Sequence, residues 1–202
     1  MTIAKGQAWG AHAPLPPDGV IVRSDAEARQ VVVAARRAGA ALPVLGLLGG
    51  DLCRTLGGTG DVARLRSGAA VTFPVDLGVV EADGRMDWFV AHLVARTRTW
   101  TRAVLALNAQ WLGPWNVAPR AHPDDALLDT YDVRLPPREL AKVRARLPTG
   151  SHLPHPGIIE RRAATATFTL GRPRRLWLDG TPVERAHHLR LSVEPDALRV
   201  VV

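Results

Sequence analysis

The chain has 202 residues and a net charge of +7, which comes almost entirely from arginine, since lysine occurs only twice. This length allows one large domain or two small ones around a buried core. The single cysteine, Cys53, excludes an internal disulfide framework, no apolar run reaches the roughly 18 residues of a membrane span, and the N-terminus lacks a secretory leader, so a cytoplasmic protein is expected.

The chain begins with a strand pattern followed by a helix pattern. The β-branched run at 19–22 predicts a strand. The stretch 25–38 predicts a helix, because its apolar residues recur every three to four positions. Ser24 or Asp25 is the candidate N-cap of this helix, and Gly39 marks its end.

A second strand and helix follow directly. The apolar run at 42–48 predicts a buried strand, and a strand–helix–strand unit of this length predicts that the two strands are parallel. Gly49 and Gly50 close this strand, and Asp51 is the candidate cap of a short helix at 52–57. The unit is therefore βαβα, with an aspartate at each strand-to-helix junction.

From about residue 70 the apolar pattern changes to a period of two. The stretch 70–96 predicts a hairpin with its turn at 83–84, and one helix is expected at 137–147, where Pro137 suits the first turn. Further short strands extend to the C-terminus. The expected fold is mixed: a small parallel α/β domain of nucleotide-binding type over 1–70, then an antiparallel β-sandwich over 71–202.

Two stretches carry a family resemblance. "NAQWLGPWNVAPRAHPDDALLDTYDV" at 108–133 is similar to a family pattern of an Asn-containing strand, a glycine-rich connection, "aPxA" and "xxDGxLDv", and "WLDGTPV" at 177–183 is similar to a late "xxDGE" turn. Together with the order of elements, these resemble the bacterial diacylglycerol kinase and lipid kinase family. The positions that fall on the first pattern are Asn108, Pro119, Ala121, Asp125, Leu128 and Asp129.

The resemblance also places "LGLLGGDLCRTLGG" at 45–58. By eye this stretch matches the family's "GGDGT" nucleotide motif, but a later segment, "lPxGTgNDfArtLg", fits the whole helix start. The main nucleotide turn then falls on 22–27, where Asp25 keeps the motif's aspartate. Its glycines are replaced by Arg23, Ser24 and Ala26.

The resemblance implies an ATP-dependent kinase that phosphorylates a lipid hydroxyl at a membrane surface, with ATP and Mg²⁺ as cofactors. Asp179 would be the general base and Asp125 a magnesium ligand. The implied cofactor-binding residues are Asp25, Gly49, Gly50, Asp51 and Asn108.

The four aspartates among these residues also have a purely structural explanation. Asp25 and Asp51 can be helix N-caps, and plain loop capping by Asp124 or Asp125 is an alternative to a metal site. Asp179 and Gly180 form a sequence typical of a type I′ hairpin turn. These alternatives stay open from the sequence alone.

Departures from the family pattern define the rival hypotheses. The late turn has Thr181 where the family has glutamate, and only about 18 residues precede the first strand, so the chain is expected to be N-terminally shortened and degenerate. A relative that binds a nucleotide, lipid or partner chain without turnover is therefore the alternative. A basic surface that binds anionic membrane or nucleic acid is a second alternative, although nucleic acid is not the expected partner. Because the arginine clusters are scattered, ordinary solvated faces are favoured over such a surface. Homo-oligomerisation stays open.

One arrangement would decide whether a site exists. If the turns at 22–26 and 48–52 open side by side on a cleft that faces Asp179, the expected site can form. If the side chain of Arg23 fills that cleft, it cannot.

Overall fold

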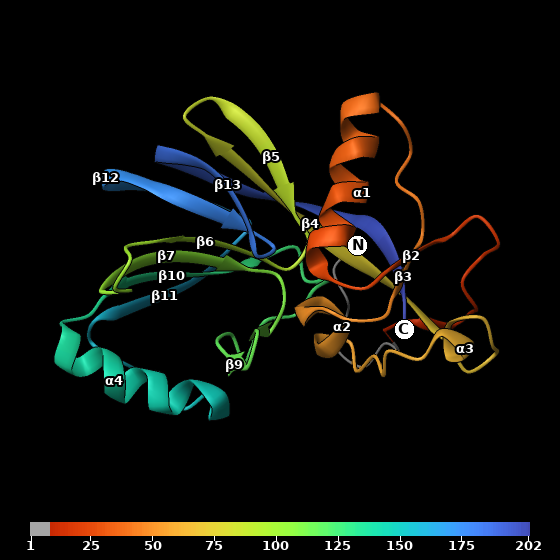
Figure 1. Cartoon of the computed structure of the whole chain (residues 1–202), viewed down its shortest axis with the longest axis horizontal. Coiled ribbons are helices and arrows are strands. Elements are labelled where there is room, and N and C mark those ends of the chain that lie inside the picture. The colour runs from red at the N-terminus through yellow and green to blue at the C-terminus, as the bar shows by residue number, and fades with distance from the viewer. Residues whose placement is uncertain (1–8) are drawn as a thin grey trace.

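The protein, described by a computed structural model over residues 9–202, has a mixed α/β fold dominated by antiparallel sheet (Figure 1). The N-terminal stretch expected to lack a leader lies partly outside these residues. The helices are α1 (Asp25–Ala38), α2 (Asp51–Thr55), α3 (Val62–Leu65), α4 (Pro137–Arg146) and the 3₁₀ turn η1 (Leu147–Thr149). The strands are β1 (Ala11–His12), β2 (Val20–Val22), β3 (Leu45–Leu47), β4 (Val71–Ala82), β5 (Arg85–Phe89), β6 (His92–Arg96), β7 (Arg102–Leu107), β8 (Trp111–Leu112), β9 (Trp115–Asn116), β10 (Leu128–Arg134), β11 (Ile158–Ala163), β12 (Thr165–Leu178) and β13 (Thr181–Val201).

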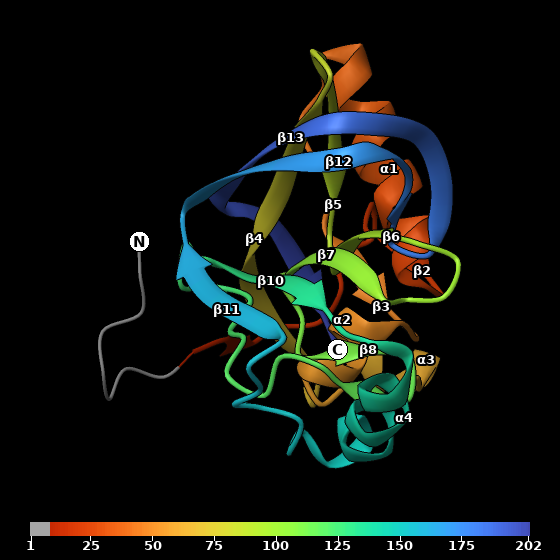
Figure 2. The same ribbon diagram turned by 90° about the vertical axis from the view of Figure 1, so that its left-hand side faces the viewer.

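Eleven of the described strands belong to one folded-over sheet. The hydrogen-bonded order is β1-β4-β13-β12-β6-β7-β10-β11, with β5 on β4, and with β2 and β3 attached through β13. In Figures 1 and 2, β4, β5, β12 and β13 form one layer that faces β6, β7, β10 and β11. Apolar side chains of both layers, such as Leu93, Leu176 and Leu189, pack between them. The expected sandwich is therefore present.

Parallel pairing is confined to one corner of the sheet. β2 and β3 are parallel, as expected, and β3 is also parallel to the end of β13, where Leu45 lies opposite Val200. The last strand of the chain thus adds a third parallel strand beside the βαβ unit of β2, α1 and β3. The buried Ala28 and Val32 of α1 pack on residues of these three strands. Residue 71, the expected start of the second domain, is the first residue of β4, which pairs with β13.

Helix α1 begins and ends as predicted. Its N-cap is Ser24, whose hydroxyl accepts a hydrogen bond from the amide of Glu27 at 3.2 Å, and Gly39 closes it with a left-handed φ of 63°. The helix at 137–147 is also confirmed as α4. Over the described residues, no helix is long and apolar enough to cross a membrane.

One expected strand is broken in two. The sequence predicts a continuous strand after the turn at 83–84, but β5 ends at Phe89 and β6 begins at His92. The amides at this break are bound by the carboxylate of Asp179 instead of a neighbouring strand. Conversely, β12 and β13 are long and continuous through shifts of register, where separate short strands were expected.

Candidate functional site

The two strand-to-helix turns meet at one cleft, next to the turn between β12 and β13. The cleft has a volume of about 300 Å³ and is lined by Ser24, Asp25, Ala26, Gly50, Asp51, His92, Leu112, Gly113, Asp179 and Gly180. Arg23 is exposed and does not line it. The turns at 22–26 and 48–52 therefore open side by side towards Asp179, and Arg23 leaves the cleft open.

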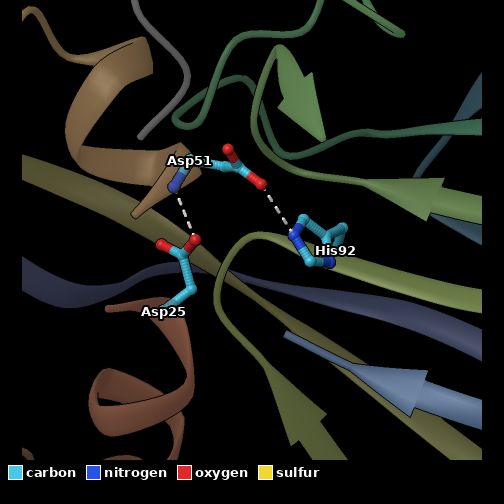
Figure 3. A group of neighbouring side chains, drawn as sticks. All are labelled: Asp25, Asp51 and His92. Atoms are coloured by element: carbon cyan, nitrogen blue, oxygen red, sulfur yellow. Dashed lines mark hydrogen bonds and ion pairs between the residues drawn. The ribbon is translucent and has the colours of Figure 1, made fainter. Parts of the chain in front are cut away.

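Asp25 caps helix α2, to which it does not belong. Its carboxylate accepts the amides of Asp51 at 2.5 Å and Leu52 at 3.1 Å, the first two amides of that helix (Figure 3). The predicted cap, Asp51, makes no capping bond, because the N-cap position is Gly50 and the amides are already taken. Burial, and then the nearby charge of Asp179, raise the pKa of Asp25 to about 6.

The two glycines allow the turns to pack this closely. Gly50 has φ 98°, and a Cβ there would lie 2.5 Å from Oδ1 of Asp25. A Cβ on Gly49 would lie 2.6 Å from the carbonyl oxygen of Arg23. The approach of one turn to the other thus requires both glycines, whether or not a phosphate binds beside them.

Asp51 points into the cleft and forms an ion pair. Its Oδ2 lies 3.0 Å from Nε2 of His92, and both of its oxygens accept the amide of Gly113 at 2.9–3.0 Å (Figure 3). Burial opposes ionisation of Asp51, but the hydrogen bonds from His92 and Gly113 outweigh it and lower the pKa. Burial likewise disfavours charged His92, yet Asp51, Asp179 and Asp25 together raise its pKa. The structure therefore favours a charged Asp51–His92 pair.

Asp179 lies in the turn between β12 and β13. Its φ of 50° and that of Gly180, 77°, fit the expected type I′ turn. Its carboxylate accepts three backbone amides, those of Val90 and Ala91 at 2.8 Å and His92 at 3.0 Å. Burial raises the pKa of Asp179, although His92 and these amides oppose the shift. Asp179 is therefore both a residue of the hairpin turn and a lining residue of the cleft.

Asn108, an expected cofactor ligand, lies under the cleft rather than in it. It is 1% exposed, and its Nδ2 donates to the carbonyl oxygens of Asp76 at 2.8 Å and Val90 at 3.1 Å. It therefore holds β4 against the segment that binds Asp179.

Asp125, the expected magnesium ligand, is paired with an arginine. Oδ2 of Asp125 forms an ion pair with Arg162, and Nε of the same arginine lies 3.3 Å from Oδ1 of Asp129. Oδ1 of Asp125 accepts a hydrogen bond from the amide of Leu127. The guanidinium thus supplies the positive charge between the two aspartates. These residues do not fit a magnesium ion, and Asp125 has the loop-capping bond that its sequence allows.

The residues of the cleft suit the phosphates of ATP better than they suit Mg²⁺. Asp25 and Ala26 line the cleft, and their amides, the first of α1, have no partner among the described residues, so these amides are available to a phosphate. The first two amides of α2 already donate hydrogen bonds to Asp25, so they are not available to a phosphate. Donor atoms of Asp25, Asp51 and His92 lie within 4.8 Å of one another, but an imidazole is a poor ligand for Mg²⁺. Phosphate therefore fits at α1, and magnesium fits poorly.

An apolar pocket adjoins the cleft. Its volume is about 320 Å³, and it lies between β7, β10, the β8–β9 hairpin and α4. Leu112 of β8 lines both the pocket and the cleft. The walls contributed by α4 and the hairpin include Leu140, Val143 and Trp115. A polar site and an apolar pocket thus share a wall.

Sequence reasoning missed three residues of the site: His92, Leu112 and Gly113. His92 is an isolated histidine in the apolar run "FVAHLVA", and that placement is its only signal in the sequence. Leu112 and Gly113 belong to a short hairpin, and nothing local indicates that it folds over the cleft.

Comparison with solved structures identifies the fold. A diacylglycerol kinase structure from Bacillus anthracis matches with a TM-score of 0.67 at 15% identity, over 91% of this chain and 77% of that one. A second from the same organism matches with a TM-score of 0.63 at 15% identity, over 91% and 75%. This chain has a diacylglycerol kinase-type fold. No family model and no curated protein matches the sequence, so the likeness extends to the fold alone.

Proposed function

We propose that this chain binds a diacylglycerol-like lipid and transfers a phosphoryl group from ATP to its free hydroxyl. The observation that carries the proposal is the wall shared at Leu112 between the apolar pocket and the cleft that contains Asp179. The pocket's size is at the lower end of those that bind small ligands, and its lining suits an acyl chain. A lipid in that pocket would place its polar end at the cleft.

Asp179 has the properties of a general base for the hydroxyl. Three backbone amides fix its carboxylate, and its raised pKa makes it more basic than an exposed aspartate. His92 holds the Asp51 carboxylate and adds a positive charge beside Asp179. When bound, the nucleotide supplies the phosphoryl group, and the amides of Asp25 and Ala26 are the groups that would face its phosphates.

The test is transfer of labelled phosphate from ATP to diacylglycerol in mixed micelles, with the lipid product extracted and counted. The wild-type chain should form a labelled phospholipid, and Asp179→Asn should bind the lipid but not label it. Lipid affinity and melting temperature of the variant are measured alongside, because Asp179 also has structural bonds. Equal turnover in Asp179→Asn would reject its role as base.

A second function is favoured by a specific observation. The carboxylate of Asp25 occupies the amides of α2, and His92 occupies Asp51, so groups that could hold phosphate and metal bind one another. This arrangement suits a protein that binds the lipid without transfer. Lipid binding with no labelled product, and no thermal shift with ATP and Mg²⁺, would establish this second function in place of the first.

A further inference from the structure

The far end of the sandwich carries a groove rich in arginine. The groove has a volume of about 1140 Å³ and is lined by the end of β6, the start of β7, the end of β10 and the middle of β12. These ends of β6, β7 and β10 point away from α1–α3 (Figure 1). Arg96, Arg98 and Arg102 come from the β6–β7 hairpin, and Arg134 comes from β10. The scattered basic clusters of the sequence are thus partly gathered by the fold.

The opposite layer contributes four more arginines. Arg172, Arg174 and Arg175 belong to the irregular part of β12, and Arg185 belongs to β13. The eight arginines face one acidic lining residue, Asp132, which leaves seven positive charges. The whole chain also has a net charge of +7, so its remaining lysines, arginines and acids balance one another.

Most of the positive charge of the groove is not neutralised by carboxylates of the described residues. Asp132 pairs with Arg134 at 2.8 Å, and no other groove arginine has a carboxylate partner among the ion pairs of the described residues. Burial, and then the neighbouring charge of Arg102, lower the pKa of Arg174. Crowding of like charges destabilises a fold unless an anion relieves it, so the groove is suited to an anionic ligand.

The groove also has an apolar lining, and it shares two lining residues with the apolar pocket. Val104, Phe168 and Leu170 lie among the arginines. Arg98 and Val133 line both the groove and the pocket beside the cleft. Apolar surface next to unpaired arginines fits an amphipathic anion better than the backbone of a nucleic acid.

A stacked arginine marks the boundary between groove and pocket. The guanidinium of Arg96 lies 4.6 Å from the ring centre of Trp100, a pocket residue, and 4.5 Å from that of Trp177, a groove residue. Arg96 and His92 are the two ends of β6, which places the groove about 13 Å along the strand from the cleft. Tryptophan and arginine together are typical of protein surfaces at the level of lipid headgroups.

We propose that this arginine groove binds the phosphate headgroups of anionic lipids at a bilayer surface and so holds the adjoining apolar pocket, with which it shares Arg98 and Val133, close to the membrane. The two observations that carry it are the uncompensated charge of the groove and its shared lining with the pocket. The inference is independent of phosphoryl transfer, since membrane docking would serve either a kinase or a lipid-binding protein.

The test is sedimentation of the full chain with vesicles, without nucleotide. Vesicles of phosphatidylcholine are compared with vesicles that also contain phosphatidylglycerol. The double variant Arg172→Gln, Arg175→Gln removes two exposed groove charges. Its matched control, Arg66→Gln, Arg199→Gln, removes two exposed charges outside the groove. Melting temperatures confirm that both variants are folded.

Binding should require the anionic lipid. The groove variant should bind roughly 25-fold more weakly, since each arginine near an anionic surface contributes about fivefold. The control should lose far less, because salt screens charges beyond about 8 Å. Equal losses in both variants, or no binding to anionic vesicles, would overturn the proposal.

Two competitors separate the other sources of phosphate. Displacement from vesicles by inorganic phosphate at low concentration would assign the groove to a free anion, and would overturn membrane docking. Tighter binding of a single-stranded RNA, lost in the groove variant alone, would assign it to nucleic acid and would also overturn it. Retention on vesicles in the presence of both competitors supports the proposal.

Discussion

At the scale of single residues, the cleft is organised by carboxylates that bind backbone amides far away in the sequence. Asp25 binds the amides at the start of α2, and Asp179 binds those between β5 and β6. Each carboxylate therefore adds side-chain hydrogen bonds between two segments, next to the backbone pairing of β2 with β3 in one case and of β12 with β6 in the other. This gives both aspartates a structural role, independent of any role in catalysis.

We expect Asp25→Ala to lower the free energy of unfolding by about 1–3 kcal/mol, because it leaves two amides of α2 without an acceptor. Urea unfolding monitored by circular dichroism measures the change. Asp18→Ala, at an exposed aspartate, is the control and should be nearly neutral. Equal stability of the Asp25 variant and this control would show that the cap does not contribute.

The sequence predicted which residue types meet at the cleft, but not their partners. Asp25, Asp51 and Asp179 were all expected at one site, and they are brought to it. That Asp25 would cap the helix of Asp51 depends on a contact between turns 26 residues apart, for which the local sequence carries no signal. His92 was missed for the same reason, since only the folded chain places it beside Asp51.

At the scale of elements, local patterns were reliable where bonds are local. Helix α1 follows its prediction, because its cap, apolar face and C-terminal glycine all lie within its own residues. The break between β5 and β6 was not predictable, since its cause is a carboxylate about 90 positions later. The pairing of β3 with β13 depends in the same way on distant segments.

Gly50 provides a test of the packing between the two turns. We expect Gly50→Ala to destabilise the fold by about 2–4 kcal/mol, since the substitution is strained at φ 98° and its Cβ also collides with Asp25. Gly57→Ala is the matched control: it has φ 75° but open space around a Cβ, and should cost only about 1–2 kcal/mol. Thermal unfolding compares the two, and a larger loss in the control would contradict the packing argument.

Helix α4 provides a test of the apolar pocket. Leu140→Glu places a carboxylate among apolar side chains of the pocket, and we expect it to weaken binding of a fluorescent diacylglycerol analogue by about tenfold or more. Ala141→Glu introduces the same charge on the exposed side of the same helix and should leave the affinity almost unchanged. If both variants bind the analogue as the wild type does, the acyl chain lies elsewhere.

At the scale of the whole molecule, arginines and aspartates gather at different sites, and the order of residues in the sequence does not indicate this separation. The basic clusters look scattered along the chain, which favours ordinary solvated faces. Folding brings eight arginines from three separate segments and β13 to one groove, while aspartates gather at the cleft at the opposite end of β6. This separation of charge depends on pairing between strands that are distant in the sequence, so the spacing of residues could not predict it.

The buried aspartates also determine how stability should depend on pH. Burial raises the pKa of Asp25, Asp76 and Asp129 from 3.8 to about 6. Between these values the folded chain binds more protons than the unfolded chain, so stability decreases as pH rises from about 4 to 6. The raised pKa of His92 acts in the same direction: its contribution is complete below its unfolded pKa and is lost as pH rises through the folded value.

Asp51 sets the acidic limit of this dependence. Its lowered pKa contributes stability that is present above 3.8 and is lost as pH falls through the folded value. We therefore expect the melting temperature to be higher at about pH 5 than at about pH 8, and to fall again in stronger acid. Calorimetry at constant ionic strength measures the melting temperature across this pH range.

Asp129→Asn should flatten the decrease of melting temperature between about pH 4 and 6, because it removes one of the protons taken up on folding. A melting temperature that rises steadily from about pH 5 to 8 would mean that these aspartates are not buried in their ionised form at neutral pH.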